Sequence, residues 1–219
     1  MGLMKRIALI LIGLFITSKT IGQIVKLQVG TSISNLDWKI GDRDNPFFDQ
    51  SLVGYSIFFG LDYKDKKYYN LSSNIGFLTK GGMEDDYIGP DPEDPNFISD
   101  RIDKAKLNYL SINTVVDFKY PIKKVLTPFI SVGPRFDYLV SHNETIDWLD
   151  EELNNYNFGL LLGGGLKYDF SKIQIGLRSD YYLNFNNIAE WKANSNGAPG
   201  SKINDKTFTI NLTLGYKLK

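Results

Sequence analysis

Residues 208–218 read Phe-Thr-Ile-Asn-Leu-Thr-Leu-Gly-Tyr-Lys-Leu, and apolar side chains alternate with polar or small ones along the whole stretch. Successive side chains of a β-strand point to opposite faces, so this pattern predicts a strand with one apolar and one polar face. A helix of the same sequence would spread both sets around its circumference. The stretch therefore predicts a sheet whose two faces meet two different environments.

Seven further segments show the same two-residue period. Each is about the length that crosses a bilayer as a tilted strand. Together with the C-terminal stretch they predict an all-β chain of eight strands. The seven segments are 24–34, 51–63, 68–79, 107–120, 128–140, 158–168 and 173–185.

Short and long connections alternate between these segments. An outer-membrane barrel has short periplasmic turns and longer extracellular loops, and its sheet closes because lipid cannot pair an open edge. The rhythm predicts an eight-stranded antiparallel up-and-down transmembrane β-barrel with both termini in the periplasm. The tight turns are 62–67, 121–124 and 169–172, and the long polar connections are 35–50, 80–105, 141–156 and 186–205.

The amino-acid composition excludes several classes of protein. The 219 residues are 42% hydrophobic, which excludes a disordered chain. There is no Cys, so disulfides, thiol catalysis and thiolate metal sites are excluded. Lys plus Arg and Asp plus Glu both number 25, so no general attraction to nucleic acid is expected.

The N-terminus has the parts of a secretory signal in the required order. A basic pair is followed by a ten-residue apolar run at 7–16 and by small residues before Gln23. Ten apolar residues are too few to span a bilayer. We therefore expect residues 1–22 to be a cleaved signal peptide and residues 23–219 to be the outer-membrane barrel domain.

Charge is distributed unequally along the mature chain, which keeps 22 basic and 25 acidic residues after the signal is removed. Residues 81–100 contain seven acidic side chains and no basic one, and 144–152 adds five more acids. The predicted turns, by contrast, are rich in Lys. We expect acidic extracellular loops and basic periplasmic turns.

The inward faces of the predicted strands carry charges of both signs. Unpaired charges would be costly there, so we expect a buried network of ion pairs and hydrogen bonds without a conducting pore. Tyrosines near the strand ends suit the interfacial girdles of a membrane barrel. The inward charges are Asp117, Arg135, Asp137, Lys167, Arg178 and Asp180, and the girdle candidates are Tyr63, Tyr120, Tyr168, Tyr181 and Tyr216.

His142, the only histidine, lies beside Ser141 and near Glu144, which could suggest a lipid-modifying hydrolase at the barrel rim. A nucleophile and its base must come within hydrogen-bond reach, however, and adjacent strand positions face apart. A solvated loop histidine is the favoured interpretation. One histidine also excludes a poly-histidine metal site.

Three other patterns have a chemical and a structural interpretation. The acidic residues 84–100 could hold calcium, but they lack the order of an EF-hand loop, which favours a solvated loop. Residues 159–167 resemble a phosphate loop but lack Gly-Lys-Ser/Thr and lead into no helix, so glycines facing a narrow lumen explain them better. For Arg178 and Asp180 a structural ion pair is favoured over a binding site.

The segments also carry a resemblance to a family. Leu107 to Asn113, then Phe118-Lys119-Tyr120, lead into residues 127–134, Thr-Pro-Phe-Ile-Ser-Val-Gly-Pro, and residues 163–168 and 214–218 continue the pattern. The mature chain resembles the PorT-like outer-membrane β-barrel family of Bacteroidetes, although that family tends to have Pro at the position of Asn113. The resemblance implies a barrel in the outer membrane. One namesake belongs to a secretion machinery, and fold alone does not transfer that role.

These observations predict a non-enzymatic outer-membrane scaffold for extracellular loops, with no catalytic, cofactor-binding or metal-binding residue assigned. The expected partners are outer-membrane lipid and a protein bound through the loops or periplasmic turns, and no nucleic acid. Three alternatives stay open: a component of a PorT-like secretion or envelope-assembly complex, a lipid-modifying enzyme, and a soluble secreted lipid-binding barrel with its apolar face inward.

Overall fold

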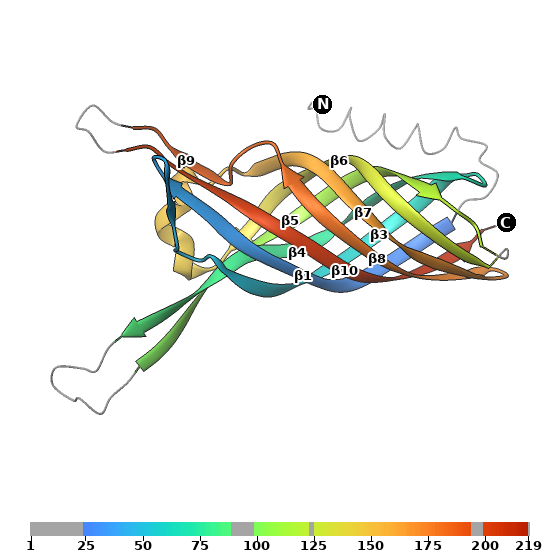
Figure 1. Cartoon of the computed structure of the whole chain (residues 1–219), viewed down its shortest axis with the longest axis horizontal. Coiled ribbons are helices and arrows are strands. Elements are labelled where there is room, and N and C mark those ends of the chain that lie inside the picture. The colour runs from blue at the N-terminus through green and yellow to red at the C-terminus, as the bar shows by residue number, and fades with distance from the viewer. Residues whose placement is uncertain (1–23, 89–98, 123–124, 194–198, 219) are drawn as a thin grey trace, which may run out of the picture.

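Eight long strands form one closed sheet in the computed structural model, which describes residues 24–88, 99–122, 125–193 and 199–218 (Figure 1). The predicted signal peptide, residues 1–22, lies outside the described residues. Within them no helix is both long and apolar enough to cross a membrane. The long strands are β1 (Ile24–Ile40), β3 (Gln50–Asp65), β4 (Tyr69–Ile88), β5 (Ser99–Lys119), β6 (Leu126–His142), β7 (Tyr156–Phe170), β8 (Ile173–Asn184) and β10 (Ser201–Lys217). Two short strands, β2 (Arg43–Asn45) and β9 (Ala189–Trp191), and the 3₁₀-helix η1 (Glu144–Glu152) complete the described elements.

The seam between β1 and β10 closes the barrel. The two strands pair antiparallel from Ile24 opposite Lys217 to Ile40 opposite Ser201. The other long strands pair with their neighbours in chain order, so the predicted eight-stranded up-and-down barrel is confirmed. Closure leaves the wall without an open edge, as a lipid environment requires.

The two ends of the barrel differ as the connection lengths predicted. At one end, on the right of Figure 1, lie the start of β1, the end of β10 and the short links β3–β4, β5–β6 and β7–β8; we call it the turn end. The opposite end, the loop end, carries the longer connections. There, residues 84–88 pair with 99–103 and form a two-stranded ribbon that projects past the rest of the wall (Figure 1).

An apolar band, which we call the belt, covers the outer wall. On β10 and just beyond, Phe208, Leu212 and Leu218 mark its top, middle and bottom, with 38%, 66% and 51% of their surface exposed. The ten steps from Phe208 to Leu218, at about 3.3 Å each and tilted by about 40°, span about 25 Å, the height of the apolar band of membrane barrels. The girdle candidates face outward here: Tyr120, Tyr168, Tyr181 and Tyr216 are exposed and Tyr63 is half-buried.

Most long strands extend farther toward the loop end than the sequence predicted. β1 continues to Ile40, where a loop was expected from residue 35. In this extension the apolar Leu36 and Trp38 point inward and are buried. The expected pattern of outward apolar residues therefore ends at residue 34, although the strand itself continues to Ile40.

Glycines on β7 make room for lumen side chains, as predicted for residues 159–167. A Cβ atom on Gly163 would overlap the Asp180 carboxylate, and one on Gly165 would overlap the Leu177 carbonyl oxygen. These positions accept no larger residue without a shift of the neighbouring strand. The phosphate-loop interpretation is wrong, because this segment is the interior of a strand.

Candidate functional site

Six charged side chains near the turn end form the turn-side layer of the lumen. Asp117 on β5 accepts hydrogen bonds from Lys167 Nζ at 2.7 Å and Arg178 Nη1 at 3.1 Å. Arg178 Nε also donates to Asp180 Oδ2 at 2.7 Å. Lys26 and Asp62 form a further pair at 2.7 Å, so three cations meet three carboxylates. The predicted buried network is confirmed for Asp117, Lys167, Arg178 and Asp180.

The lumen contacts join strands that are not neighbours in the sheet. Arg178 on β8 reaches Asp117 on β5, and Lys26 on β1 donates to Ser72 on β4 at 3.1 Å. One layer higher, Gln28 Nε2 donates to Asn74 Oδ1 at 2.9 Å, again from β1 to β4. Side chains therefore bridge the lumen from wall to wall, so the interior is packed by the wall's own residues.

A second set of charges, the loop-side layer, lies closer to the loop end. Lys80 Nζ is 2.9 Å from Asp137 Oδ2 and 3.3 Å from Asp205 Oδ2, and all three side chains are fully buried. The same ammonium lies 5.0 Å from the centroid of the Tyr109 ring. Arg135 pairs with Asp137, so two cations again meet two carboxylates.

Above the loop-side layer the interior becomes apolar, and we call this part the cap. Its core is continuous with Phe58, Val115 and Leu161 farther down the lumen. Residues from η1 and from the segment before β9 pack inward from above, so the connections themselves seal the loop end. The cap residues are Leu36, Trp38, Phe48, Ala105, Leu107, Leu139, Ile146, Leu149, Leu153, Ile188, Ala189 and Ile203, all at most 8% exposed.

Asn143 ends the wall between β5 and β6. Its backbone N–H donates to the Lys106 carbonyl oxygen at 3.2 Å. Its side chain accepts from the Lys106 N–H at 2.8 Å and donates to the Lys104 carbonyl oxygen at 2.7 Å. The amide thus takes the place of one more strand residue and directs the chain into η1.

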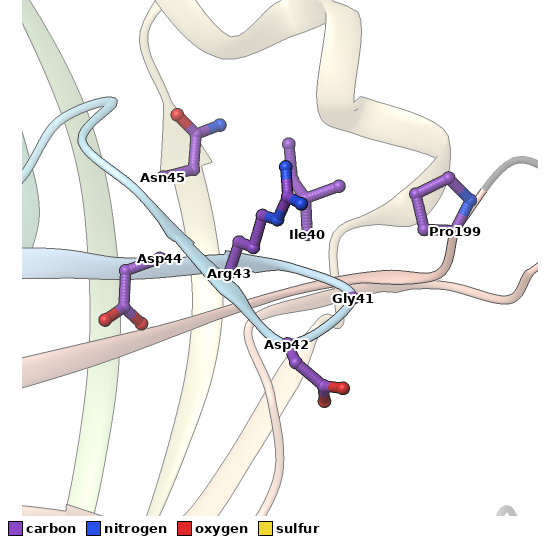
Figure 2. A pocket seen from close by; sticks show the side chains of 7 residues that line it. All are labelled: Ile40, Gly41, Asp42, Arg43, Asp44, Asn45 and Pro199. Carbon is purple, nitrogen blue, oxygen red and sulfur yellow. The ribbon is translucent and has the colours of Figure 1, made fainter.

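A recess of about 590 Å³ lies beside the β1–β2 hairpin. Figure 2 shows Ile40, Arg43 and Asn45 on one side of the ribbon, with Pro199 across from them, whereas Asp42 and Asp44 point to the other side. Alternation in the hairpin therefore separates one guanidinium and one amide from two carboxylates. The arrangement can take a group that accepts hydrogen bonds or carries negative charge.

Comparison with protein families identifies the family of this chain. Residues 10–190 match the family model described as outer membrane protein beta-barrel domain. The chain belongs to this family. The protein is therefore an outer-membrane barrel, and the prediction of its location is confirmed.

Three solved structures match this chain over at least 90% of its length. OprG from Pseudomonas aeruginosa is 10% identical, with a TM-score of 0.57 over 91% of this chain and 97% of that one. Neisserial surface protein A is 12% identical, with a TM-score of 0.46 over 90% and 97%. The outer membrane protease OmpT from Escherichia coli is 9% identical, with a TM-score of 0.43 over 92% and 98%. The search of curated proteins found no match.

In this outer-membrane barrel Ser141 and His142 have different partners. Ser141 Oγ accepts a hydrogen bond from Asn108 Nδ2 at 3.1 Å. His142 Nδ1 lies 3.2 Å from Asp147 Oδ1 and 3.5 Å from the Asn143 carbonyl oxygen. The geometry thus gives these two side chains the separate environments that strand alternation predicted.

No metal site is found among the described residues of the barrel: they contain no group of three or more His, Cys, Asp or Glu that could hold an ion. The calcium alternative for residues 84–100 falls largely on positions 89–98, outside the described residues. The pair Arg178 and Asp180 is confirmed as a buried ion pair within the turn-side layer.

Four lumen charges of the barrel were missed by sequence reasoning. Asp62 was assigned to a turn, and Lys80 and Asp205 to loops, but all three lie in strands and point inward. Lys26 lies in the first segment, whose alternation is the weakest. Charge balance gave no signal for them, because the six inward charges predicted from the sequence are already three acidic and three basic.

Proposed function

We propose that this outer-membrane protein is a non-enzymatic anchor that presents its loop end at the cell surface. Residues 1–22 direct its export and are removed, and both termini of the mature chain lie in the periplasm. Short turns at the end that holds both termini, and long connections at the other, support this orientation.

The reversal of side-chain polarity along the strands carries the proposal. In the belt the outer wall is apolar and most lumen residues are polar, whereas in the cap the interior is apolar and the wall carries ion pairs such as Lys206–Asp37 at 3.2 Å. The first arrangement suits lipid and the second suits water. The cap thus has the character of a soluble domain that stands above the membrane.

The packed lumen leaves the outer surface of the cap as the part that can act on other molecules. Connecting segments held by a rigid scaffold are where binding residues concentrate. The resemblance to the PorT-like family supports the finer proposal that the barrel belongs to that branch. Membership in a secretion or envelope-assembly complex is the alternative to an independent anchor.

Fractionation and tagging test the proposal. We expect extraction only with detergent, and a gel band whose mobility changes on boiling. A tag inserted between Asp94 and Pro95 should be labelled on intact cells, whereas a tag between Ser171 and Lys172 should be labelled only after permeabilisation. The reverse labelling would overturn the orientation, and recovery without detergent would overturn the anchor itself.

Two further measurements separate the alternatives. Purification in mild detergent should yield the barrel alone; a stoichiometric protein partner would favour the complex. His142→Ala should leave the outer-membrane lipid profile unchanged, and a lost lipid modification would establish the enzyme.

A further inference from the structure

The β1–β2 hairpin sorts its side chains by charge. Ile40 pairs with Arg43 and Trp38 with Asn45, so these four side chains share one face. On the other face Lys39 Nζ lies 3.4 Å from Asp44 Oδ1, which offsets that carboxylate. The hairpin thus presents a guanidinium and an amide without a carboxylate between them.

Arg43 has no ion-pair partner among the residues that the structure describes, and its side chain is exposed. Figure 2 shows it beside Ile40, with Pro199 completing the lining of the recess. Asn45 supplies an amide that can both donate and accept. On this side of the ribbon the recess therefore combines one charged donor, one bifunctional polar group and two apolar surfaces, whereas Asp42 and Asp44, which also line it, point to the other side (Figure 2).

The height of the recess above the belt limits what can reach it. Ile33, opposite Phe208, is the last belt residue of β1, and Ile40 follows seven residues later. At about 3.3 Å per residue and a tilt of about 40°, the recess lies roughly 18 Å above the belt. The polar layer of a bilayer is only about 6 Å thick on each side, so lipid phosphates do not reach the site.

We propose that the recess formed by Ile40, Arg43, Asn45 and Pro199 binds an acidic saccharide. Arg43 holds the carboxylate with two parallel N–H donors, and Asn45 bonds a ring hydroxyl. Ile40 and Pro199 cover the C–H face of the sugar, which a simple inorganic anion would leave unused. This inference rests on the proposed exposure of the loop end at the cell surface.

Calorimetry on the full mature chain, folded in detergent micelles, tests the proposal. The probes are trigalacturonate, the neutral maltotriose, inorganic phosphate and triglutamate. We expect binding of trigalacturonate and at least tenfold weaker binding of the other three. Arg43→Ala should weaken trigalacturonate binding at least tenfold, about the loss expected for one charge-assisted hydrogen-bond pair. Arg43→Lys keeps the charge but loses the planar fork, so binding should fall severalfold.

Lys206→Ala is the matched control, because it removes one exposed positive charge from the same end of the barrel, on the outer wall. Its trigalacturonate affinity should equal that of the parent chain. Equal losses in the Arg43→Ala and Lys206→Ala variants, equal binding of phosphate or triglutamate, or no binding of trigalacturonate would each overturn the proposal.

The binding result is independent of orientation. Micelles expose both ends of the barrel, so a failed surface-labelling experiment would overturn the proposed function without changing the calorimetry. A failed calorimetric titration on a heat-modifiable, folded barrel would overturn the saccharide site alone.

Discussion

The belt and the cap are built from the same strands, yet their side chains are arranged in opposite ways. On β10, Leu212 faces outward and Asn211 is buried in the lumen, whereas nine residues earlier Ile203 is buried and Lys202 is exposed. The two-residue period continues unbroken through both regions. The two-residue period therefore indicates a strand, whereas the face on which the apolar residues lie indicates the solvent outside that strand.

The loop-side layer of charges lies where the side-chain arrangement of the belt gives way to that of the cap. Lys80 lies three residues beyond Phe77, and Asp205 lies three residues before Phe208, the last belt residues of their strands. Below this level the lumen holds the charges of the turn-side layer, and above it lies the apolar cap. The charges therefore lie near the level where the surroundings of the wall change from lipid to water.

The largest expected effect comes from the centre of the turn-side layer. Asp117→Ala leaves Lys167 and Arg178 buried without their shared carboxylate, which should cost about 3–5 kcal/mol of unfolding free energy. Urea titration of the refolded barrel, followed by the heat-modifiable band, measures this. The control Asp44→Ala removes an exposed carboxylate and should change stability by less than about 0.5 kcal/mol. Equal effects would mean that the lumen network does not stabilise the barrel.

A charge placed on the outer wall tests whether the belt and the cap meet different solvents. Leu212→Lys puts an ammonium in the middle of the belt and should cost about 2–4 kcal/mol in lipid vesicles. Asn204→Lys, on the same strand and the same outer face but at cap level, loses the hydrogen bond that Asn204 Oδ1 accepts from Asn184 Nδ2 and should cost only about 1 kcal/mol. If both substitutions cost the same, the belt and the cap do not meet different solvents.

We expect the cap to unfold locally while the belt stays folded. Leu149→Ala removes buried side-chain atoms from η1, which should lower the free energy of local opening by about 2 kcal/mol. Limited proteolysis should cut faster near η1, while the urea midpoint of the heat-modifiable band stays unchanged. A lowered midpoint would show that cap and belt unfold as one unit.

The smallest effect is expected at the end of the wall. Asn143→Ala removes two side-chain hydrogen bonds to the β5 backbone, which should cost about 1 kcal/mol of local stability. Faster hydrogen exchange at the Lys106 amide, with unchanged exchange at belt amides, would show it. Unchanged exchange at Lys106 would mean that water replaces the Asn143 amide at no cost.

The belt could be predicted from sequence because one rule holds throughout it. Apolar residues alternate outward, tight turns such as 169–172 fix the register, and inward charges such as Arg178 and Asp180 follow from the phase. The eight strands and their order were correct for this reason. Four residues of the turn-side layer, Asp117, Lys167, Arg178 and Asp180, were identified in this way.

The cap was not predicted, because its strands obey the same period with the opposite phase. Residues 35–40 of β1 and the start of β10 lose the outward apolar pattern and were assigned to loops. Lys80 and Asp205 were missed with them, and so was the Arg43 recess, which depends on a hairpin within a predicted loop. Burial of Ile146 and Leu149 by η1 depends on contacts distant in sequence, which no local pattern contains.

The seam between β1 and β10 determines when the barrel can close during folding. One edge of β1 pairs with the nearby β3, but its other edge pairs with β10, which lies far along the chain, so that edge stays unpaired until β10 arrives. Pairings of such long sequence separation form slowly, and an exposed strand edge attracts other chains meanwhile. The chain must therefore reach the membrane unfolded and shielded, and the barrel can close only after β10 has arrived.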